Sequence, residues 1–299
     1  MITDTATRAR WSHLRLRQTK HLRDLVAETS FTVDQLIQPL FIVEGMTGAQ
    51  PITGLGANAR LSETAALDVM AKDLDAGVRH FLLFAIPNTK TRVPTRFDHL
   101  RRTTTAIKQR FGDALHLWVD VCLCASTENG HCAIVDSRGR IDLSPTLDAL
   151  AAMDDQGHEH VPIMSYSTKF ASHFYGPFRE AAGSAPQFGD RRHHQIDVRS
   201  RRDAIASSVR CANEGADLLM VKPGMTSLDL IGPIADATRK PVGAYQVSGE
   251  YAGLLALAEQ GLASLDALLL ETWLVFRRAG ASFVITYGAR DARAAGLRA

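Results

Sequence analysis

The chain has 299 residues, of which 45% are hydrophobic and 22% are charged, and its formal net charge is +2. This is the composition of an ordinary globular protein, and so small a charge argues against a nucleic-acid partner. The N-terminal residues are polar, and no apolar run approaches the roughly eighteen residues of a membrane span. We therefore expect neither a secretory signal nor a membrane partner, but a cytoplasmic protein whose four cysteines stay reduced.

One pattern recurs along the chain: an amphipathic stretch ends in a glycine, and a hydrophobic run follows at once. Gly77, Gly215 and Gly280 hold this position. A glycine suits the left-handed conformation that ends many helices. The runs that follow are continuous rather than alternating, as in strands that are covered on both faces. Repetition of helix, glycine and buried strand predicts a parallel α/β fold, and the length suits a TIM-type barrel.

The predicted elements alternate along the chain. The hydrophobic runs predicted as strands are 38–45, 80–86, 115–123, 161–167, 217–223, 241–248 and 282–288. The predicted helices are about 62–76, 97–111, 200–214, 226–239, 250–260 and 265–279. No low-complexity linker interrupts residues 31–299, so we expect one domain there. A TIM-type barrel has eight strands, and the seven found here leave a gap between residues 133 and 160.

Three cysteines lie close together after the third predicted strand, and α/β folds carry their chemistry where strands end. Cys122 and Cys124 point the same way from an extended segment, and a turn could return Cys132 to them. Three thiolates suit Zn²⁺ and leave its fourth position open, which is typical of a reactive site. The alternatives are His131 as a fourth ligand, or three buried free thiols without metal.

Lys169 and Lys222 end two neighbouring predicted strands and have apolar and aromatic flanks. A lysine forms a Schiff base only as the neutral amine, so its pKa must fall from about 10.4 toward neutrality. Burial and a second nearby cation both lower this pKa. The pair is therefore predicted to be nucleophilic; the alternative is that each lysine extends to solvent.

A long segment rich in glycine and proline, residues 174–195, follows Lys169. Loops of this length in compact domains are usually functional lids or disordered. Arg179, Arg191 and Arg192 lie on it, and the arginine fork matches carboxylates. The segment is predicted to be a lid that clamps an acidic substrate, with a plain solvated loop as the alternative.

Several long strings make the sequence resemble the porphobilinogen synthase family, also called 5-aminolevulinate dehydratase. They span most of the chain and include QPLFIVEG, DVCLC followed by GHC, MSYSTKFASHFYGPFREAAGSAPQFGDRR, GADLLMVKPG, AYQVSGEYA and ITYGA. The resemblance implies a lyase that condenses two 5-aminolevulinate molecules to porphobilinogen in tetrapyrrole and heme synthesis. It also implies a homo-oligomer, usually an octamer, in which an N-terminal arm wraps a neighbour. Residues 1–30 fit that arm.

The resemblance also implies roles for individual residues. Lys222 and Lys169 match the two Schiff-base lysines, which hold the substrates that supply the propionate and acetate side chains of the product. The matched substrate-binding residues are Ser248 and Tyr287 on the propionate-side carboxylate, Arg179, Arg191 and Gln195 on the acetate-side carboxylate, Asp120 beside the zinc loop, and Tyr175 as a lid aromatic.

For cofactors, the resemblance implies a zinc ion held by Cys122, Cys124 and Cys132. Such an ion would polarise the acetate-side substrate or its bound water. An allosteric Mg²⁺ ion is left open, because the sequence indicates no residues for it.

The sequence departs from the family in residues 133–160, which contain nothing like the family's strand and helix with their serine and aspartate. About one βα repeat is missing. The barrel is expected to close with seven strands, to stay open, or to recruit another segment. Two functional alternatives follow: a divergent enzyme that uses the same lysine and zinc chemistry on another amino-ketone or keto acid, and a non-catalytic family member.

Overall fold

The computed structural model describes residues 19–20, 26–136, 138, 140–154, 162–184, 191–192 and 194–298. The chain divides into two compact units, Met1–Ser30 and Phe31–Ala299. Most of the first unit lies outside the described residues, so the N-terminal arm stays a prediction. No helix among the described residues is long and apolar enough to cross a membrane.

The second unit contains seven parallel strands that form a barrel wall. They are β1 (Leu36–Val43), β4 (His80–Ile86), β5 (His116–Val119), β6 (Met164–Lys169), β7 (Leu218–Lys222), β8 (Val242–Gln246) and β9 (Val284–Thr286). Their spatial order is β5-β4-β1-β9-β8-β7-β6, and every neighbouring pair is parallel. The parallel α/β prediction is confirmed, and each strand overlaps its predicted range.

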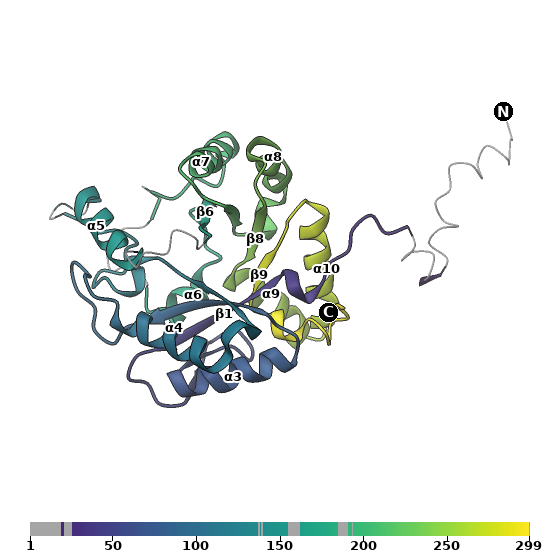
Figure 1. Cartoon of the computed structure of the whole chain (residues 1–299). Coiled ribbons are helices and arrows are strands. Elements are labelled where there is room, and N and C mark those ends of the chain that lie inside the picture. Colours follow the sequence, from purple (N-terminus) through teal and green to yellow (C-terminus); the bar gives the residue numbers. More distant parts are fainter. Residues whose placement is uncertain are drawn as a thin grey trace, which may run out of the picture. The chain divides into compact units, whose positions relative to one another are not determined.

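Helices lie between the strands in the sequence. They are α3 (Glu63–Asp75), α4 (Asp98–Phe111), α5 (Leu143–Asp154), α6 (Gly176–Ala181), α7 (Arg201–Asn213), α8 (Leu228–Thr238), α9 (Ser248–Glu259) and α10 (Leu265–Arg278). Figure 1 shows α3 and α4 on one side of the strands and α7 and α8 on another. Gly77, Gly215 and Gly280 follow helices with φ angles of 101°, 109° and 105°, as the repeating pattern predicted.

Short elements that the hydrophobic pattern did not reveal complete the unit. The hairpin of β2 (Ala49–Pro51) and β3 (Ala59–Leu61) extends the sheet, with β3 parallel to β1. Asn58 fixes this hairpin because its amide donates 3.0 Å to the carbonyl of Tyr287. Helix α6 lies in the segment that was predicted as a loop. These elements were missed because each is too short to show a period.

The wall is open between β5 and β6. Among the described residues these two strands are not paired with each other, and no described residue between them in sequence forms a strand. The described part of 133–154 instead forms an isolated bridge, Val135 to Ile141, and helix α5. The helix packs through Ala149 onto a small cluster with Leu123 and Ile134. Among the described residues, one helix therefore stands in the place of the missing strand and helix, and the barrel wall has seven strands.

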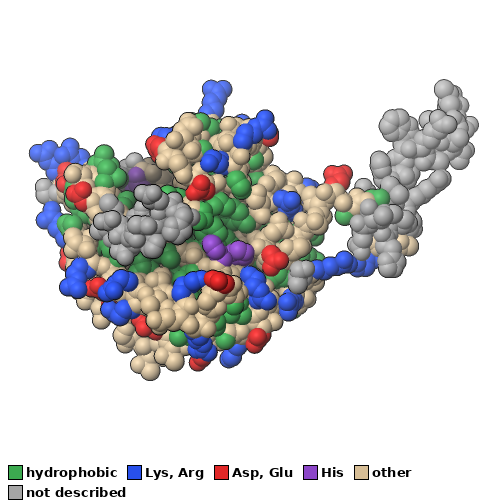
Figure 2. All heavy atoms as spheres, viewed as in Figure 1, with side chains coloured by type: hydrophobic (Ala, Val, Ile, Leu, Met, Phe, Trp, Pro, Cys, Tyr) green, Lys and Arg blue, Asp and Glu red, His purple; other side chains and the backbone are tan. Residues whose placement is uncertain are grey.

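Surface charge follows the sequence expectation. Figure 2 shows Lys and Arg side chains scattered among acidic ones over the described part of the visible face, without a continuous basic area. This distribution agrees with the small net charge of +2.

The centre of the wall depends on close packing at Gly243 in β8. A Cβ atom there would lie 2.1 Å from the ring of Phe283, which is itself buried. We predict that Gly243→Ala lowers the free energy of unfolding by about 1–3 kcal/mol, because the ring must shift. Thermal unfolding measures this change. Gly253→Ala on helix α9 is the matched control. A Cβ atom at Gly253 would meet no atom within 4 Å, and alanine should stabilise the helix by up to about 1 kcal/mol. Equal melting temperatures for the two variants would contradict the packing argument.

Candidate active site

The two lysines lie side by side at the carboxyl ends of β6 and β7. Lys169 and Lys222 are register partners in this parallel pair. The pairing contains a β-bulge, because β6 advances three residues from Ser165 to Thr168 while β7 advances two. In a regular strand Tyr166 and Lys169 would face opposite sides. The extra residue places both on the same side, and the Lys169 amine lies 5.9 Å from the centre of the Tyr166 ring.

The Lys222 amine is enclosed by aromatic rings. The side chain is 5% exposed. Its Nζ lies 4.2 Å from the ring centre of Tyr245, 4.6 Å from Tyr166, 5.1 Å from Phe178 and 5.7 Å from Tyr175. Burial, reinforced by the charge of Lys169, lowers the pKa of Lys222 to about 7. Part of this amine is therefore neutral near pH 7, as a nucleophile requires.

Lys169 has a different electrostatic environment. Burial lowers its pKa, but the attraction of the cysteine cluster, Cys132 above all, outweighs burial and raises the pKa above its ordinary value. Hydrogen bonds with Cys122 and Cys124 hold the pKa of Cys132 well below its usual range, whereas the pKa values of Cys122 and Cys124 are raised, so the negative charge of the cluster lies on Cys132. The two neighbouring amines thus have different pKa values. Lys169 stays protonated, and its charge helps to lower the pKa of Lys222. Such separation of the pKa values of neighbouring groups is typical of catalytic sites.

The three predicted cysteines come together. Their Sγ atoms all lie within 4.8 Å of one another, and the Cys122 thiol donates to Cys124 Sγ over 3.3 Å. A turn returns Cys132 to the pair: the Thr127 hydroxyl donates 2.8 Å to the carbonyl of His131, and Gly130 adopts a φ of 70°. The predicted return of the chain is confirmed. His131 is buried, but the group that could hold a metal among the described residues contains the three thiols alone.

Asp120 connects the cysteine loop to the lysines. It follows β5, and its Oδ1 accepts a hydrogen bond of 2.9 Å from the Tyr166 hydroxyl. Burial raises the pKa of Asp120 from its ordinary value, while the charge of Lys222 and the Tyr166 hydrogen bond oppose this rise. The carboxyl therefore lies within electrostatic reach of the more nucleophilic lysine.

The predicted lid contributes buried polar groups with unused hydrogen-bonding capacity. Arg191 is 5% exposed, and one terminal nitrogen donates 2.7 Å to the carbonyl of Gly130 and 2.6 Å to that of Ser184. Its Nε, the Nε of Arg179 and both amide atoms of Gln195 are buried without a hydrogen-bond partner among the described residues. Burial and the nearby Arg191 lower the pKa of the Arg179 guanidinium. Unsatisfied buried donors of this kind indicate a site for an anion.

The other predicted substrate-binding residues have protein partners. The Ser248 hydroxyl accepts 3.0 Å from the backbone N–H of Phe178, which fixes lid helix α6 against helix α9. The Tyr287 hydroxyl lies 3.2 Å from the Tyr245 hydroxyl. Tyr175 donates to the carbonyls of Phe170 at 2.9 Å and Lys222 at 3.0 Å. Tyr175 thus has its hydroxyl turned to the backbone and its ring toward the amine.

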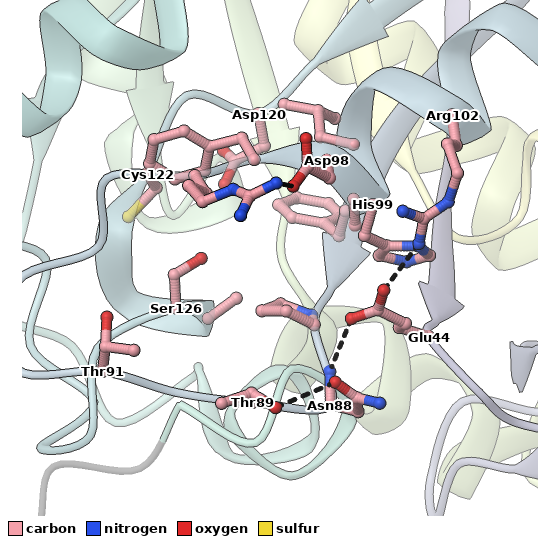
Figure 3. A pocket seen from close by; sticks show the side chains of 17 residues that line it. Glu44, Asn88, Thr89, Thr91, Asp98, His99, Arg102, Asp120, Cys122 and Ser126 are labelled. Atoms are coloured by element: carbon pink, nitrogen blue, oxygen red, sulfur yellow. Dashed lines mark hydrogen bonds and ion pairs between the residues drawn. The ribbon is translucent and has the colours of Figure 1, made fainter.

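A hollow, which we call the outer cavity, lies beside Asp120. It has a volume of about 430 Å³ and is lined by the ends of β4 and β5, the start of α4, and Glu44. Figure 3 shows Glu44 bridging Arg102 and Asn88 at one side, with Asp120 and Cys122 at the opposite side. The cavity therefore reaches Asp120 and the cysteine loop, while Lys222 is not among the residues that line it.

Sequence reasoning missed two of the rings around Lys222. Phe178 lies on the lid and Tyr245 on β8, and neither stands next to a lysine in the sequence. Tyr166 was recognised only as an aromatic flank of Lys169. Its position near Lys222 depends on the β-bulge in β6, and a single sequence carries no signal for such a bulge.

Comparison with known proteins gives consistent matches. The family model for delta-aminolevulinic acid dehydratase matches residues 10–154 and 150–295. The chain is 37% identical to the delta-aminolevulinic acid dehydratase of Synechocystis sp., with 93% of this chain and 96% of that protein covered. It is 36% identical to the protein of that name in Helicobacter pylori, with the same coverage. The alignment to the first spans 314 positions, more than the 299 residues present here, so the relative carries residues that this chain lacks.

A solved structure agrees with these matches. Delta-aminolevulinic acid dehydratase (porphobilinogen synthase) from Toxoplasma gondii ME49, in complex with its reaction product porphobilinogen, superimposes with a TM-score of 0.88. The two chains are 32% identical, and the match covers 94% of this chain and 90% of the other. The family model, the curated relatives and the solved structure all cover most of the sequence. This chain therefore belongs to the delta-aminolevulinic acid dehydratase family of lyases.

Proposed function

We propose that this protein is a porphobilinogen synthase that condenses two 5-aminolevulinate molecules, with loss of water, through Schiff bases on Lys222 and Lys169. The observation that carries the proposal is the register pairing of these lysines, with one amine enclosed by four rings. A neutral amine attacks the ketone of 5-aminolevulinate, and the resulting Schiff base withdraws electrons so that the neighbouring carbon can lose a proton.

Lys222 is the lysine that reacts first. Its lowered pKa of about 7 makes part of the amine neutral near pH 7, whereas the cysteine cluster, Cys132 above all, keeps Lys169 protonated. Two substrates held in one pocket replace a bimolecular encounter, which lowers the activation free energy by several kcal/mol. In this assignment Ser248 and Tyr287 hold the carboxylate of the substrate on Lys222.

The second carboxylate has a separate binding place. Arg179, Arg191 and Gln195 have buried polar atoms without hydrogen-bond partners among the described residues. A carboxylate satisfies such donors through charge-assisted bonds, and an arginine fork orients it. This supports the assignment of the three residues to the acetate-side substrate on Lys169. Arg191 then exchanges at least one of its backbone contacts for the substrate.

The cysteine cluster fits a zinc ion. Three thiols with Sγ atoms within 4.8 Å of one another provide the soft donor set that zinc prefers. Cys122, Cys124 and Cys132 would hold the ion, which supplies Lewis-acid polarisation of a substrate oxygen when bound. The octamer, the arm of residues 1–30 and an allosteric Mg²⁺ remain predictions, for which the described residues provide no test.

The proposed reaction is tested by incubating the purified protein with 5-aminolevulinate, assaying the pyrrole product, and reducing the adduct with borohydride. We predict an adduct on Lys222, and a loss of activity in Lys222→Ala of roughly a thousandfold or more. Lys240→Ala is the control, because Lys240 lies beyond the amino end of β8, away from the site. An adduct without a pyrrole would favour another amino-ketone as substrate. Absence of any adduct would indicate a non-catalytic protein.

The pKa of Lys222 is predicted to depend on Lys169. Because the Lys169 charge is one of the two causes that lower the Lys222 pKa, Lys169→Met should raise that pKa from about 7 toward its ordinary value. A smaller fraction of the amine is then neutral at any pH below the new pKa. NMR titration of ¹³C-methylated lysines measures the change without substrate. An unmoved Lys222 signal would show that burial alone lowers the pKa.

The metal assignment predicts that Cys124→Ser lowers the zinc content and the activity together, because it removes a buried ligand. Metal analysis after dialysis, with activity measured before and after zinc is restored, provides the check. Cys211→Ser on α7 is the control and should keep both the zinc content and the activity. Full activity of Cys124→Ser in metal-free buffer would exclude a catalytic role for zinc.

A further inference from the structure

A side-chain hydrogen bond crosses the opening between β5 and β6. No backbone pairing joins these strands among the described residues. The Tyr166 hydroxyl on β6 nevertheless donates 2.9 Å to Oδ1 of Asp120, which directly follows β5. The two groups are 46 residues apart in sequence. This bond therefore connects the two free edges of the wall.

The local backbone explains why Tyr166 can reach across. The bulge in β6 shifts the register between Ser165 and Thr168, so that Tyr166 and Lys169 face the same side. The ring of Tyr166 lies 4.6 Å from the Lys222 amine, while its hydroxyl extends to Asp120. One side chain thus contacts a lysine with its face and the opposite wall with its tip.

The same pair lies between the outer cavity and Lys222. Asp120 and Cys122 line the outer cavity of about 430 Å³. Lys222 is not among the residues that line this cavity and has an exposure of 5%. Tyr166 stands between them, since it contacts both Asp120 and Lys222. The Tyr166–Asp120 contact accordingly forms part of the layer of side chains between Lys222 and the outer cavity.

We propose that Tyr166 is a positioning residue whose hydroxyl holds Asp120 across the opening and so completes the wall beside Lys222. The bond takes the place of the backbone ladder that the missing strand would provide. This proposal rests on the proposed function, because its main consequence is kinetic. Tyr166 acts through Asp120 and through the closure of the wall, and it does not itself exchange a proton with substrate.

The test uses the full-length protein and the variant Tyr166→Phe, which keeps the ring against Lys222 and removes only the hydroxyl. Loss of one buried hydrogen bond to a carboxylate should lower kcat about tenfold or more. KM should change less than about twofold, because the carboxylate clamps are elsewhere. Zinc content and the borohydride adduct on Lys222 should match those of the unmodified protein. Tyr251→Phe removes another buried tyrosine hydroxyl, on α9, and should leave kcat within about twofold.

A double-mutant cycle with Asp120→Ala isolates the interaction. If Tyr166 acts through Asp120, the double variant loses no more activity than Asp120→Ala alone. Multiplicative losses, a kcat of Tyr166→Phe within twofold of the unmodified protein, or a loss explained by missing zinc would each overturn the proposal. Should Tyr166→Phe not fold, Asp120→Asn still decides the question. It keeps an acceptor oxygen for the hydroxyl and must retain at least about threefold more activity than Asp120→Ala; equal losses would overturn the proposal.

The two proposals fail in different ways. If the unmodified protein forms neither an adduct nor a pyrrole, the proposed function is wrong. If it forms both and Tyr166→Phe is equally fast, the proposed function stands and only the positioning role of Tyr166 is wrong.

Discussion

Removing the Lys222 amine from water is the physical requirement on which this site depends. A lysine in solvent is almost fully protonated at pH 7 and does not attack a ketone. The barrel meets the requirement by placing the amine among four aromatic rings from β6, β8 and the lid. Two of the four, Tyr175 and Phe178, belong to the lid. This segment therefore shields the amine from solvent and also carries the arginines that are proposed to bind a substrate carboxylate.

Because the Lys222 amine must be kept from water, the loss of one βα repeat next to the site has to be compensated. Removal of one βα repeat from a barrel exposes two strand edges and opens the wall. Here the opening lies next to Asp120 and the cysteine loop, which is where the acetate-side substrate is expected. Helix α5 packs on its own small cluster around Leu123 and leaves the backbone edges of β5 and β6 unpaired among the described residues. Closure near the lysines depends on side chains, chiefly the Tyr166–Asp120 contact.

Much of this arrangement follows from sequence, because continuous apolar runs and helix-ending glycines are local signals. They locate all seven strands, and the cysteine spacing predicts the thiol cluster that the structure contains. The roles of Lys169, Lys222 and the lid arginines come from motif resemblance and are still untested. The β-bulge, helix α6 and the rings of Phe178 and Tyr245 could not be predicted. Each depends on tertiary contacts between segments that carry no mark of them in the sequence.

The charge of the cysteines affects the pKa of Lys169, and the charge of Lys169 affects the pKa of Lys222. The cysteine cluster, Cys132 above all, raises the pKa of Lys169, and the charge of Lys169, together with burial, lowers the pKa of Lys222. A divalent cation held by the three cysteines would offset their negative charge and weaken the attraction that keeps Lys169 protonated. In the proposed reaction, the order in which the two amines become nucleophilic would thus depend on charges on the cysteine loop, although neither lysine lies on it.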